Sequence, residues 1–562
     1  MKRILSLLLI AVLLAGTGCR QNIPEKTYHT DLSFSELSDS GTDAALEIAR
    51  AKELRFRVER GELSGARAQE SFGARANAMR RLQTDEAIAY VRYCMDVTNA
   101  GNRQKYDTLT LQLQTLAGIL TDVALLLSED PALKDLYDAE TVEALLRADA
   151  LSDPAVLPLL ARERALEGEY EALPGKLTAE LNGRKWTGDE ILSDPTLSPD
   201  DFTYLYESYA ELFNAEAGAI FLELIAVRNE IAKTLGFDSY ADYMYACCDR
   251  DYSPEDAALF SERVKNAIVP LLSGMRNDFY GAGMRLYGMV FEEKPTMERI
   301  GTVVAGILPE LSEPWEYMLS HSMYDLGTNE TRMPGNFTVY FADCGAPFLF
   351  GSWTNGFEMP ATVVHEFGHY AAYYLNGDAV CASNSPDLAE IDAQGLELLS
   401  VLRYDTLYGS LSGAAENAQI FYSLYTLVDG CMEDAFQQFA YGQDAPTVGA
   451  LNAEYGRLAE AYGLDLLGTD ARAWTQIPHT FQSPFYYISY AVGMTAALEL
   501  YLSARKDPDA AANAYRAVLM RDRGARLSET LHAAGLSDPF APETIKRLAL
   551  ELGSERRDRM NE

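Results

Sequence analysis

Basic residues are scarce in this chain of 562 residues. Against 83 aspartates and glutamates stand 47 lysines and arginines, and the formal net charge is −36. A protein that binds nucleic acid needs a surplus of positive charge to neutralise phosphate groups, so the composition argues against nucleic acid as a partner. An acidic surface of this kind keeps a protein soluble, and it also steers cationic substrates toward the molecule.

Cysteine is scarce as well, with seven residues in the chain. No spacing among them matches the paired-cysteine pattern of a zinc knuckle, so a structural zinc module is not expected. A chain of this length buries enough surface to fold without disulfides. We therefore expect most of the cysteines beyond residue 19 to be buried or free thiols. They are Cys94, Cys247, Cys248, Cys344, Cys381 and Cys431.

Long apolar runs are scarce too. One lies at the N-terminus (residues 4–14), behind a short basic head and ahead of small residues that lead to Cys19. The run is too short to span a membrane comfortably, and the layout is typical of a bacterial secretory signal. Small residues before a cysteine resemble the lipoprotein type of signal, although Gly16 stands where such signals usually carry Leu. We expect residues 1–18 to be a signal peptide and Cys19 to be the lipidated first mature residue.

This prediction places the protein outside the cytoplasm, lipid-anchored on the outer face of the bacterial cytoplasmic membrane. Plain secretion and an uncleaved anchor are the alternatives. No second apolar run of spanning length is evident in the sequence, so we expect contact with the membrane only through this anchor. The sequence leaves the oligomeric state open.

Apolar residues make up 48% of the chain, as in a globular protein. Residues 19–40 are polar and predict a tether. Residues 41–198 carry apolar side chains at helical spacing and predict an N-terminal helical domain. Residues 199–555 predict a second, larger helical domain. The expected fold class is therefore mainly α.

Two short segments break the helical pattern. Residues 176–187 alternate apolar and polar side chains around Asn182-Gly183, which is a hairpin signal. Residues 336–353 carry aromatic and β-branched side chains on either side of a turn-like segment at 343–347. They predict a second strand pair.

One predicted helix, residues 359–377, carries the pattern with the clearest chemistry. Pro360 suits its first turn, where a missing N–H costs nothing. His365 and His369 are four residues apart, so both imidazoles lie on one face and can bind one Zn²⁺. Glu366 faces a neighbouring direction, from which it can reach a water on the metal without ligating it.

The alternative is a chance pattern on an ordinary amphipathic helix. The chain has only six histidines, so two of them at this spacing around a glutamate argue against chance. Gly368 costs about 1 kcal/mol relative to Ala in the middle of a helix. That cost indicates close packing or a constraint from the metal site.

A catalytic zinc needs a third protein ligand and an open position for water. The next predicted helix begins with Ser385 as N-cap and Pro386 as first residue. It offers Glu390, Asp392 and Glu397 as candidates. Glu397 could instead orient a ligand histidine, and spacing alone does not choose among the three.

A third cluster lies at residues 478–493. Tyr487 and Tyr490 are three residues apart and share a helical face, with Tyr486 beside them and His479 upstream. Tyrosine hydroxyls and an imidazole can donate hydrogen bonds to the oxyanion of peptide hydrolysis, and one such donor contributes roughly 3–4 kcal/mol. The alternative is an aromatic core stripe, since the chain has 33 tyrosines.

In this order the three blocks resemble the thimet oligopeptidase / oligoendopeptidase F family of zinc metallopeptidases, and most closely its bacterial oligoendopeptidase branch. Residues 365–369 match the family's His-Glu-x-Gly-His helix, residues 389–391 match the segment of its third ligand, and residues 479–491 match a His/Tyr block. Stretches at 228–243 and 340–348 are also similar. The resemblance runs from about residue 175 to 505.

The family resemblance implies one Zn²⁺ per chain and favours Glu390 among the three candidates. The implied metal ligands are His365, His369 and Glu390, and the implied catalytic residues are Glu366 as general base with His479, Tyr487 and Tyr490 as transition-state donors. Many members carry a third histidine where this chain has Ala372. That histidine is not a ligand, so the difference leaves zinc binding intact.

The resemblance also implies a helical ellipsoid split by a deep channel that admits unstructured oligopeptides. The strand pair at 336–353 would lie along the channel and could pair with an extended substrate. The expected function is therefore zinc-dependent endopeptidase action on oligopeptides. A related helical zinc carboxypeptidase and an inactive, surface-tethered peptide-binding lipoprotein are the alternatives.

Overall fold

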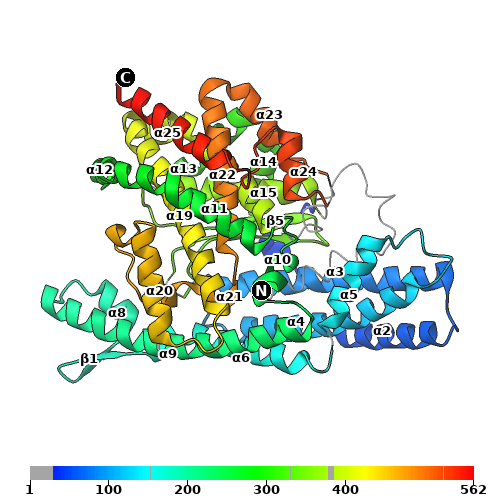
Figure 1. Ribbon diagram of the computed structural model, residues 1–562. Helices are drawn as coiled ribbons and strands as arrows, with labels where there is room; N and C mark the ends of the chain where they lie inside the picture. The colour runs from blue at the N-terminus through cyan, green and yellow to red at the C-terminus, as the bar shows by residue number, and fades with distance from the viewer. Residues whose placement is uncertain (1–28, 152, 330, 378–384, 523, 562) are drawn as a thin grey trace.

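The computed structural model describes residues 29–151, 153–329, 331–377, 385–522 and 524–561. The predicted signal peptide, Cys19 and Cys381 lie outside these residues. Helices dominate the described chain, as expected for a mainly α fold. Figure 1 shows a base of long helices with the C-terminal helices stacked above it.

The N-terminal region forms a helical bundle with its own hydrophobic cluster, drawn from residues 44–145. Side-chain caps begin several of the helices: Asp43 accepts a hydrogen bond from Leu46 N, and Asn99 accepts from Gly101 N and Asn102 N. The helices are α2 (Ala44–Glu59), α3 (Gly65–Met95), α4 (Ala100–Ser128) and α5 (Ala139–Ala150). The second half of α3 packs into the main core, so this helix joins the two clusters.

By length and composition, helix α4 is suited to cross a membrane. This apolar run was overlooked in the sequence. It packs against α2 and α3. Leu116, Leu120 and Leu127 are fully buried there. These contacts are those of a core helix in a folded bundle.

The predicted hairpin at 176–187 is confirmed. Strands β1 (Ala179–Leu181) and β2 (Arg184–Trp186) pair antiparallel, and Asn182 and Gly183 adopt the positive φ values that a two-residue turn requires. The hairpin packs against the start of α9 (Pro199–Thr234), at one end of the molecule (Figure 1). The connecting helices are α6 (Leu157–Glu171), α7 (Leu173–Lys176) and α8 (Gly188–Ser193).

The predicted strand pair at 336–353 is also confirmed, and it belongs to a three-stranded sheet. Strand β4 (Phe337–Phe341) pairs antiparallel with β5 (Ala346–Phe350). A third strand that the sequence did not reveal, β3 (Tyr324–Asp325), pairs parallel on the other side of β5. Strand β4 is therefore an edge of this sheet.

Most of the remaining chain is helical and shares the main hydrophobic core. Between the hairpin and the sheet lie α10 (Tyr240–Cys247), α11 (Pro254–Ala267), α12 (Val269–Leu286), α13 (Glu293–Ile307) and α14 (Ser312–Ser320). After the sheet come α15 (Met359–Asn376), α17 (Pro386–Ser400), α18 (Tyr404–Tyr408), α19 (Ser412–Tyr441), α20 (Val448–Ala461), α21 (Pro478–Gln482), α22 (Tyr487–Lys506), α23 (Pro508–Leu519), α24 (Leu527–Ala534) and α25 (Thr544–Asn561).

Two glycines let α17 approach its neighbours closely. A Cβ on Gly368 of α15 would lie 2.5 Å from the backbone oxygen of Asp392, and a Cβ on Gly493 of α22 would lie 2.8 Å from Cβ of Glu390. Neither position has room for a side chain. Close packing therefore accounts for Gly368, and it holds α17 between the two helices that carry the other candidate site residues.

Candidate metal centre

Three side chains from two helices converge on one point. His365 and His369 project from α15, and Glu390 projects from α17. One ligand atom from each lies within 4.8 Å of the others, and no other such group is found among the described residues. The structure thus brings together the three residues that the family resemblance implied as metal ligands.

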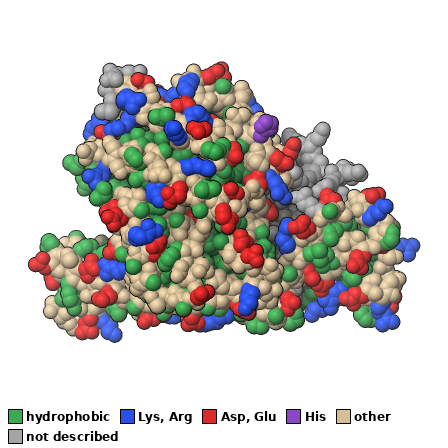
Figure 2. Space-filling view, in the orientation of Figure 1, with side chains coloured by type: hydrophobic (Ala, Val, Ile, Leu, Met, Phe, Trp, Pro, Cys, Tyr) green, Lys and Arg blue, Asp and Glu red, His purple; other side chains and the backbone are tan. Residues whose placement is uncertain are grey.

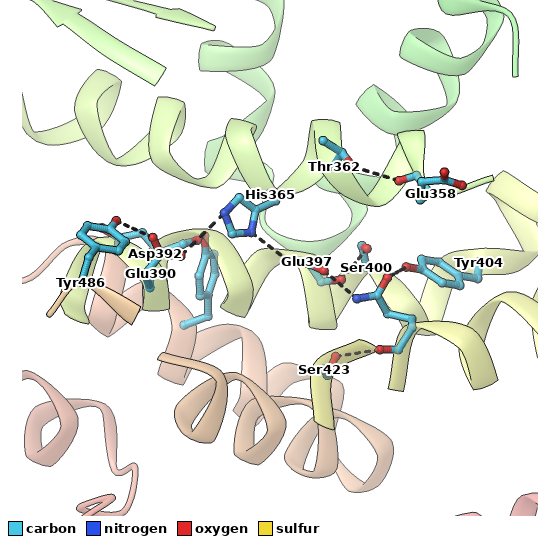
Figure 3. Close-up of polar contacts among 12 residues, drawn as sticks. Glu358, Thr362, His365, Glu390, Asp392, Glu397, Ser400, Tyr404, Ser423 and Tyr486 are labelled. Carbon is cyan, nitrogen blue, oxygen red and sulfur yellow. Dashed lines mark hydrogen bonds and ion pairs between the residues drawn. The ribbon is translucent and has the colours of Figure 1, made fainter. Parts of the chain in front are cut away.

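The start of α17 sets the position of Glu390. Ser385 caps the helix by accepting a hydrogen bond from Leu388 N at 3.4 Å, and Pro386 is its first residue, as predicted. Glu390 is only 2% exposed. Its Oε1 accepts a hydrogen bond from the Tyr486 hydroxyl at 2.7 Å (Figure 3). Its Oε2 has no hydrogen-bond partner among the described residues and lies 3.7 Å from Nε2 of His365.

Glu397 and Asp392 are not placed as ligands. Glu397 Oε2 contacts Nδ1 of His365 at 2.9 Å, which leaves Nε2 available to a metal (Figure 3). Gln419 in turn donates to Glu397 Oε1 at 2.6 Å. Asp392 instead forms an ion pair with Arg521 at 2.7 Å. The orienting role considered for Glu397 in the sequence is therefore the one that its contacts favour.

Glu366 lies beside the three candidate ligands and is 8% exposed. The Thr338 hydroxyl lies 3.0 Å from both Oε2 and the backbone oxygen of Glu366. Thr338 belongs to the edge strand β4, so the strand pair helps to orient the proposed base. Burial raises the pKa of Glu366, while the charge of His365 and the hydrogen bond with Thr338 oppose that rise.

Negative charge is concentrated around His365. Burial lowers the pKa of this imidazole, but the hydrogen bond with Glu397 and the charges of Glu397, Glu390 and Glu366 outweigh burial and raise it to about 9. Burial and the charge of His365 lower the pKa of His369 to about 3. Burial raises the pKa of Glu390 to about 7. Buried carboxylates so placed call for a compensating cation.

A zinc ion fits this set of donors. Two imidazoles and one carboxylate are a known ligand set of catalytic zinc, with a fourth position left for water. Glu390 Oε2 is a buried acceptor without a hydrogen-bond partner among the described residues. His365 and His369 each use one ring nitrogen on the protein, His365 with Glu397 and His369 with the backbone of Ala389. The other nitrogen of each ring is then left for the metal.

The tyrosine cluster lies next to this centre. The ring of His479 lies 5.6 Å from Tyr486, 5.3 Å from Tyr487 and 6.2 Å from Tyr490, measured between centroids. Burial lowers the pKa of His479 to about 4, so its imidazole is neutral near pH 7. Tyr486 contacts Glu390, whereas Tyr487 and Tyr490 line a cleft beside the metal centre. The transition-state roles of His479, Tyr487 and Tyr490 stay predictions.

Strained backbone aims Tyr486 at Glu390. The preceding residue, Phe485, has φ of 61° and is fully buried. A left-handed conformation costs a non-glycine residue roughly 1–2 kcal/mol. Gln437 accepts from Phe485 N at 2.6 Å, and Arg250 donates to Phe485 O at 2.7 Å. These two contacts hold the strained residue, and no sequence pattern revealed them.

The cleft beside the metal centre has a volume of about 560 Å³, within the range of known ligand sites. It is lined by residues of α15, α17, α19 and α22 together with Asn336 and Glu358. Its charged lining residues are His365, Glu358, Glu366, Glu397 and Asp429. Lysine and arginine are absent from this lining in the described part of the chain.

No protein-family profile matches the chain, and no curated protein sequence matches it. Solved structures do match. A protein assigned as oligoendopeptidase F superposes with a TM-score of 0.77 at 22% identity over 94% of this chain and 98% of its own. Pz peptidase A with an inhibitor superposes with a TM-score of 0.76 at 19% identity over 92% of this chain and 97% of its own. A protein from Bacillus anthracis str. Ames that is assigned as oligoendopeptidase F gives a TM-score of 0.75 at 18% identity over 93% of this chain and 98% of its own.

A carboxypeptidase from Pyrococcus furiosus matches less well, with a TM-score of 0.55 at 14% identity over 89% of this chain and 98% of its own. The protein therefore has the mainly helical peptidase fold of oligoendopeptidase F, and the resemblance in sequence is confirmed for the fold. The match covers nearly the whole chain. It thus includes the N-terminal helices, for which the sequence resemblance offered only helical character.

Proposed function

We propose that this chain, which has the oligoendopeptidase F fold, is a zinc-dependent endopeptidase that hydrolyses unstructured oligopeptides. The observation that carries the proposal is the convergence of His365, His369 and Glu390 beside Glu366, at the wall of a cleft. That arrangement combines a metal site with a buried carboxylate that does not ligate the metal. The pairing is the one that metal-assisted peptide hydrolysis requires.

Each residue of the site has its own proposed role in hydrolysis. His365, His369 and Glu390 would hold zinc, and Glu397 orients His365 through Nδ1. Zinc, when bound, lowers the pKa of a coordinated water to about 7 and polarises the scissile carbonyl.

Glu366 takes the proton of the attacking water and passes it to the leaving amine. Thr338 holds Glu366 in place for this transfer. His479, Tyr487 and Tyr490 are the proposed donors to the oxyanion. Tyr486, which already donates to Glu390, is engaged with the metal ligand.

The surroundings of Glu366 support an extended substrate. Strand β4 is a sheet edge, and its Thr338 contacts the proposed base directly. An extended peptide that adds to this edge would pass the metal centre with its main chain exposed to Glu366. A folded protein cannot present such a segment, so unstructured oligopeptides are the proposed substrates.

The carboxypeptidase alternative is the less favoured of the two peptidase readings. A carboxypeptidase must bind the negative charge of a free C-terminus, for which an arginine or lysine is the usual partner. The described lining of the cleft holds acidic residues and no lysine or arginine. An inactive peptide-binding lipoprotein has no use for the buried Glu366. We also propose export of the protein through its N-terminal signal, with lipidation at Cys19.

Cleavage of a doubly blocked peptide tests the proposal. We expect the zinc-loaded protein to cut an internally quenched peptide that has an acetylated N-terminus and an amidated C-terminus, and mass spectrometry to show internal cleavage. Release of single residues from free C-termini alone would indicate the carboxypeptidase. Binding without any cleavage would indicate the inactive lipoprotein.

A further inference from the structure

Asp429 stands out on the wall of the cleft formed by α19. It is half-buried and lines the same cavity as His365 and Glu366. Within the described ranges it has no hydrogen bond and no ion pair. Burial raises its pKa to about 7. A carboxyl group in this position loses hydration without gaining a partner from the protein.

A second carboxyl group, that of Glu433, lies one helical turn further along α19. Glu433 is fully buried. Tyr455 donates to its Oε1 at 2.5 Å, but its Oε2 has no hydrogen-bond partner in the described part of the chain. Burial and the charge of Asp429 raise the pKa of Glu433 well above its ordinary value. The two residues are four apart on one helix and therefore share a face.

Some other buried acidic residues of this protein are paired with arginine. Asp392 contacts Arg521 at 2.7 Å, and Glu163 contacts Arg228 at 2.7 Å. These pairs follow the general rule that a buried charge needs a partner. Asp429 and Glu433 have no arginine or lysine contact among the described residues, so the protein itself does not supply their counterion.

Tyr487 lines the same cleft as Asp429, and Tyr425 lies one helical turn before Asp429 on α19. Burial raises the pKa of Tyr487, and the charges of Asp429 and Glu433 add to that rise, which indicates that the three lie close together. The same two charges act on Tyr425, whose pKa is raised first by burial. Aromatic faces next to a carboxylate are suited to guanidinium and ammonium groups.

The site adjoins the metal centre. The rings of Tyr487 and Tyr490 lie 5.3 Å apart. The pKa of Tyr490 is raised by burial and then by the charges of Glu390, Tyr487 and Glu366. Tyr487 thus lines one cleft together with Asp429 and Tyr490, beside the proposed centre of catalysis.

We propose that Asp429, backed by Glu433 and flanked by Tyr425 and Tyr487, is a subsite for a cationic group of the substrate. The group is an ammonium or guanidinium, carried by a lysine or arginine side chain near the scissile bond or by the peptide's N-terminus. This inference rests on the proposed peptidase function and adds a substrate class to it. The Asp429 carboxylate accepts the hydrogen bonds of the cation, and the Tyr487 ring contacts its flat or apolar surface.

A set of N-acetylated, internally quenched peptides tests the subsite. The peptides are identical except that arginine, lysine, norleucine or glutamate is placed at each position around the cleavage site. We expect kcat/KM for arginine or lysine at one position to exceed that for norleucine by at least about tenfold, since a hydrogen bond to a charged group contributes roughly 1.5–3 kcal/mol. Asp429→Asn should bring this ratio to within about threefold of unity.

Asp444→Asn is the matched control, because Asp444 is exposed on the surface and the substitution removes the same charge. Its selectivity should stay that of the wild type. A second set with free N-termini distinguishes the sources of the cation. Preference confined to free N-termini assigns the subsite to the terminal ammonium, and preference within acetylated peptides assigns it to a side chain.

Equal rates for arginine, lysine and norleucine in both wild-type sets would overturn the subsite, and this result needs no variant to fold. Unaltered selectivity in Asp429→Asn would overturn it as well. In either case cleavage of the norleucine peptide leaves the peptidase proposal standing. Failure to cut any blocked peptide would overturn the peptidase proposal itself.

Discussion

The two walls of the cleft differ in whether their carboxyl groups have partners within the protein. On the wall formed by α15 and α17, Glu366 contacts Thr338, Glu390 contacts Tyr486 and Glu397 contacts His365. On the wall formed by α19, Asp429 has neither a hydrogen bond nor an ion pair among the described residues. On the same helix, Oε2 of the buried Glu433 has no hydrogen-bond partner in that part of the chain either.

The difference teaches that the partners of a carboxyl group indicate its task better than its burial does. Partnered groups are oriented for chemistry at one point, which suits metal binding and proton transfer. Asp429, which has no partner among the described residues, is the group that we propose for a cation arriving with the substrate. The contrast between the two walls supports the proposed enzyme, which would hold its metal on one side and select its peptide on the other.

The most severe test of the first wall is Glu366→Gln. The amide keeps the shape of the side chain but cannot accept a proton from water. We expect kcat/KM to fall by at least about a thousandfold, within the usual range for removal of a general base, while zinc content measured by mass spectrometry stays at one per chain.

Glu460→Gln, an exposed substitution on α20, serves as the control and should retain activity. A Glu366→Gln protein that cleaves the quenched peptide at a near-normal rate would contradict the role given to Glu366. It would also remove the contrast between the two walls.

Glu397→Ala is expected to weaken zinc binding rather than to slow the chemical step. Loss of the carboxylate frees the His365 ring, and removal of such an orienting group typically weakens metal affinity by about 10- to 100-fold. Zinc competition with a chromogenic chelator measures the change. Activity at saturating zinc should recover to a large extent. Unchanged affinity would mean that Glu397 does not orient the ligand.

Local patterns in the sequence were enough for the elements whose signals lie in neighbouring residues. The hairpin was predicted because Asn182-Gly183 favours the tight turn. The convergence of His365 and His369 was predicted because their spacing places both rings on one face of the predicted helix. Strand β3 was not predicted, because two residues carry no periodicity and their partner strand β5 lies farther along the chain.

Contacts between distant segments set the finer features of the site, and the sequence did not reveal them. Thr338 reaches Glu366 only because β4 packs against α15. Tyr486, which contacts Glu390 across 96 residues of chain, follows Phe485, whose backbone is left-handed. Helix α4 was predicted within the N-terminal helical domain, but its spanning length and apolar composition were overlooked.

Thr338→Val asks whether the edge strand contributes to the first wall. The substitution keeps the shape but removes the hydrogen bond to Glu366. A hydrogen bond to a charged group contributes roughly 1.5–3 kcal/mol, of which only the part specific to the transition state appears in the rate. We expect kcat to fall about tenfold with little change in KM. A change in KM alone would assign Thr338 to substrate binding instead.

Asp429→Asn should also change stability, in the direction opposite to an ordinary loss of contacts. The pKa of Asp429 is raised by burial to about 7 in the folded protein. An aspartate in the unfolded chain has a pKa of about 3.9. The wild type therefore loses stability as pH rises from about 4 to about 7, and the loss is complete above that range. The variant lacks the loss of stability that is due to Asp429 and keeps only the part of this pH dependence that is due to Glu433.

We expect the advantage of Asp429→Asn over wild type to be roughly 1–2 kcal/mol larger at pH 8 than at pH 5, after discounting for water in the cleft. Thermal unfolding of the zinc-loaded proteins at the two pH values measures it. Asp444→Asn should show no such dependence on pH. A variant that is less stable than wild type at both values would show that Asp429 has a partner in the folded protein.

Metal content paired with activity tests the central claim most directly. The account predicts one zinc per chain in the purified protein, loss of peptide cleavage when the metal is removed by a chelator, and recovery of cleavage on addition of about one equivalent of zinc. Cleavage that persists in protein shown to be free of metal would contradict it.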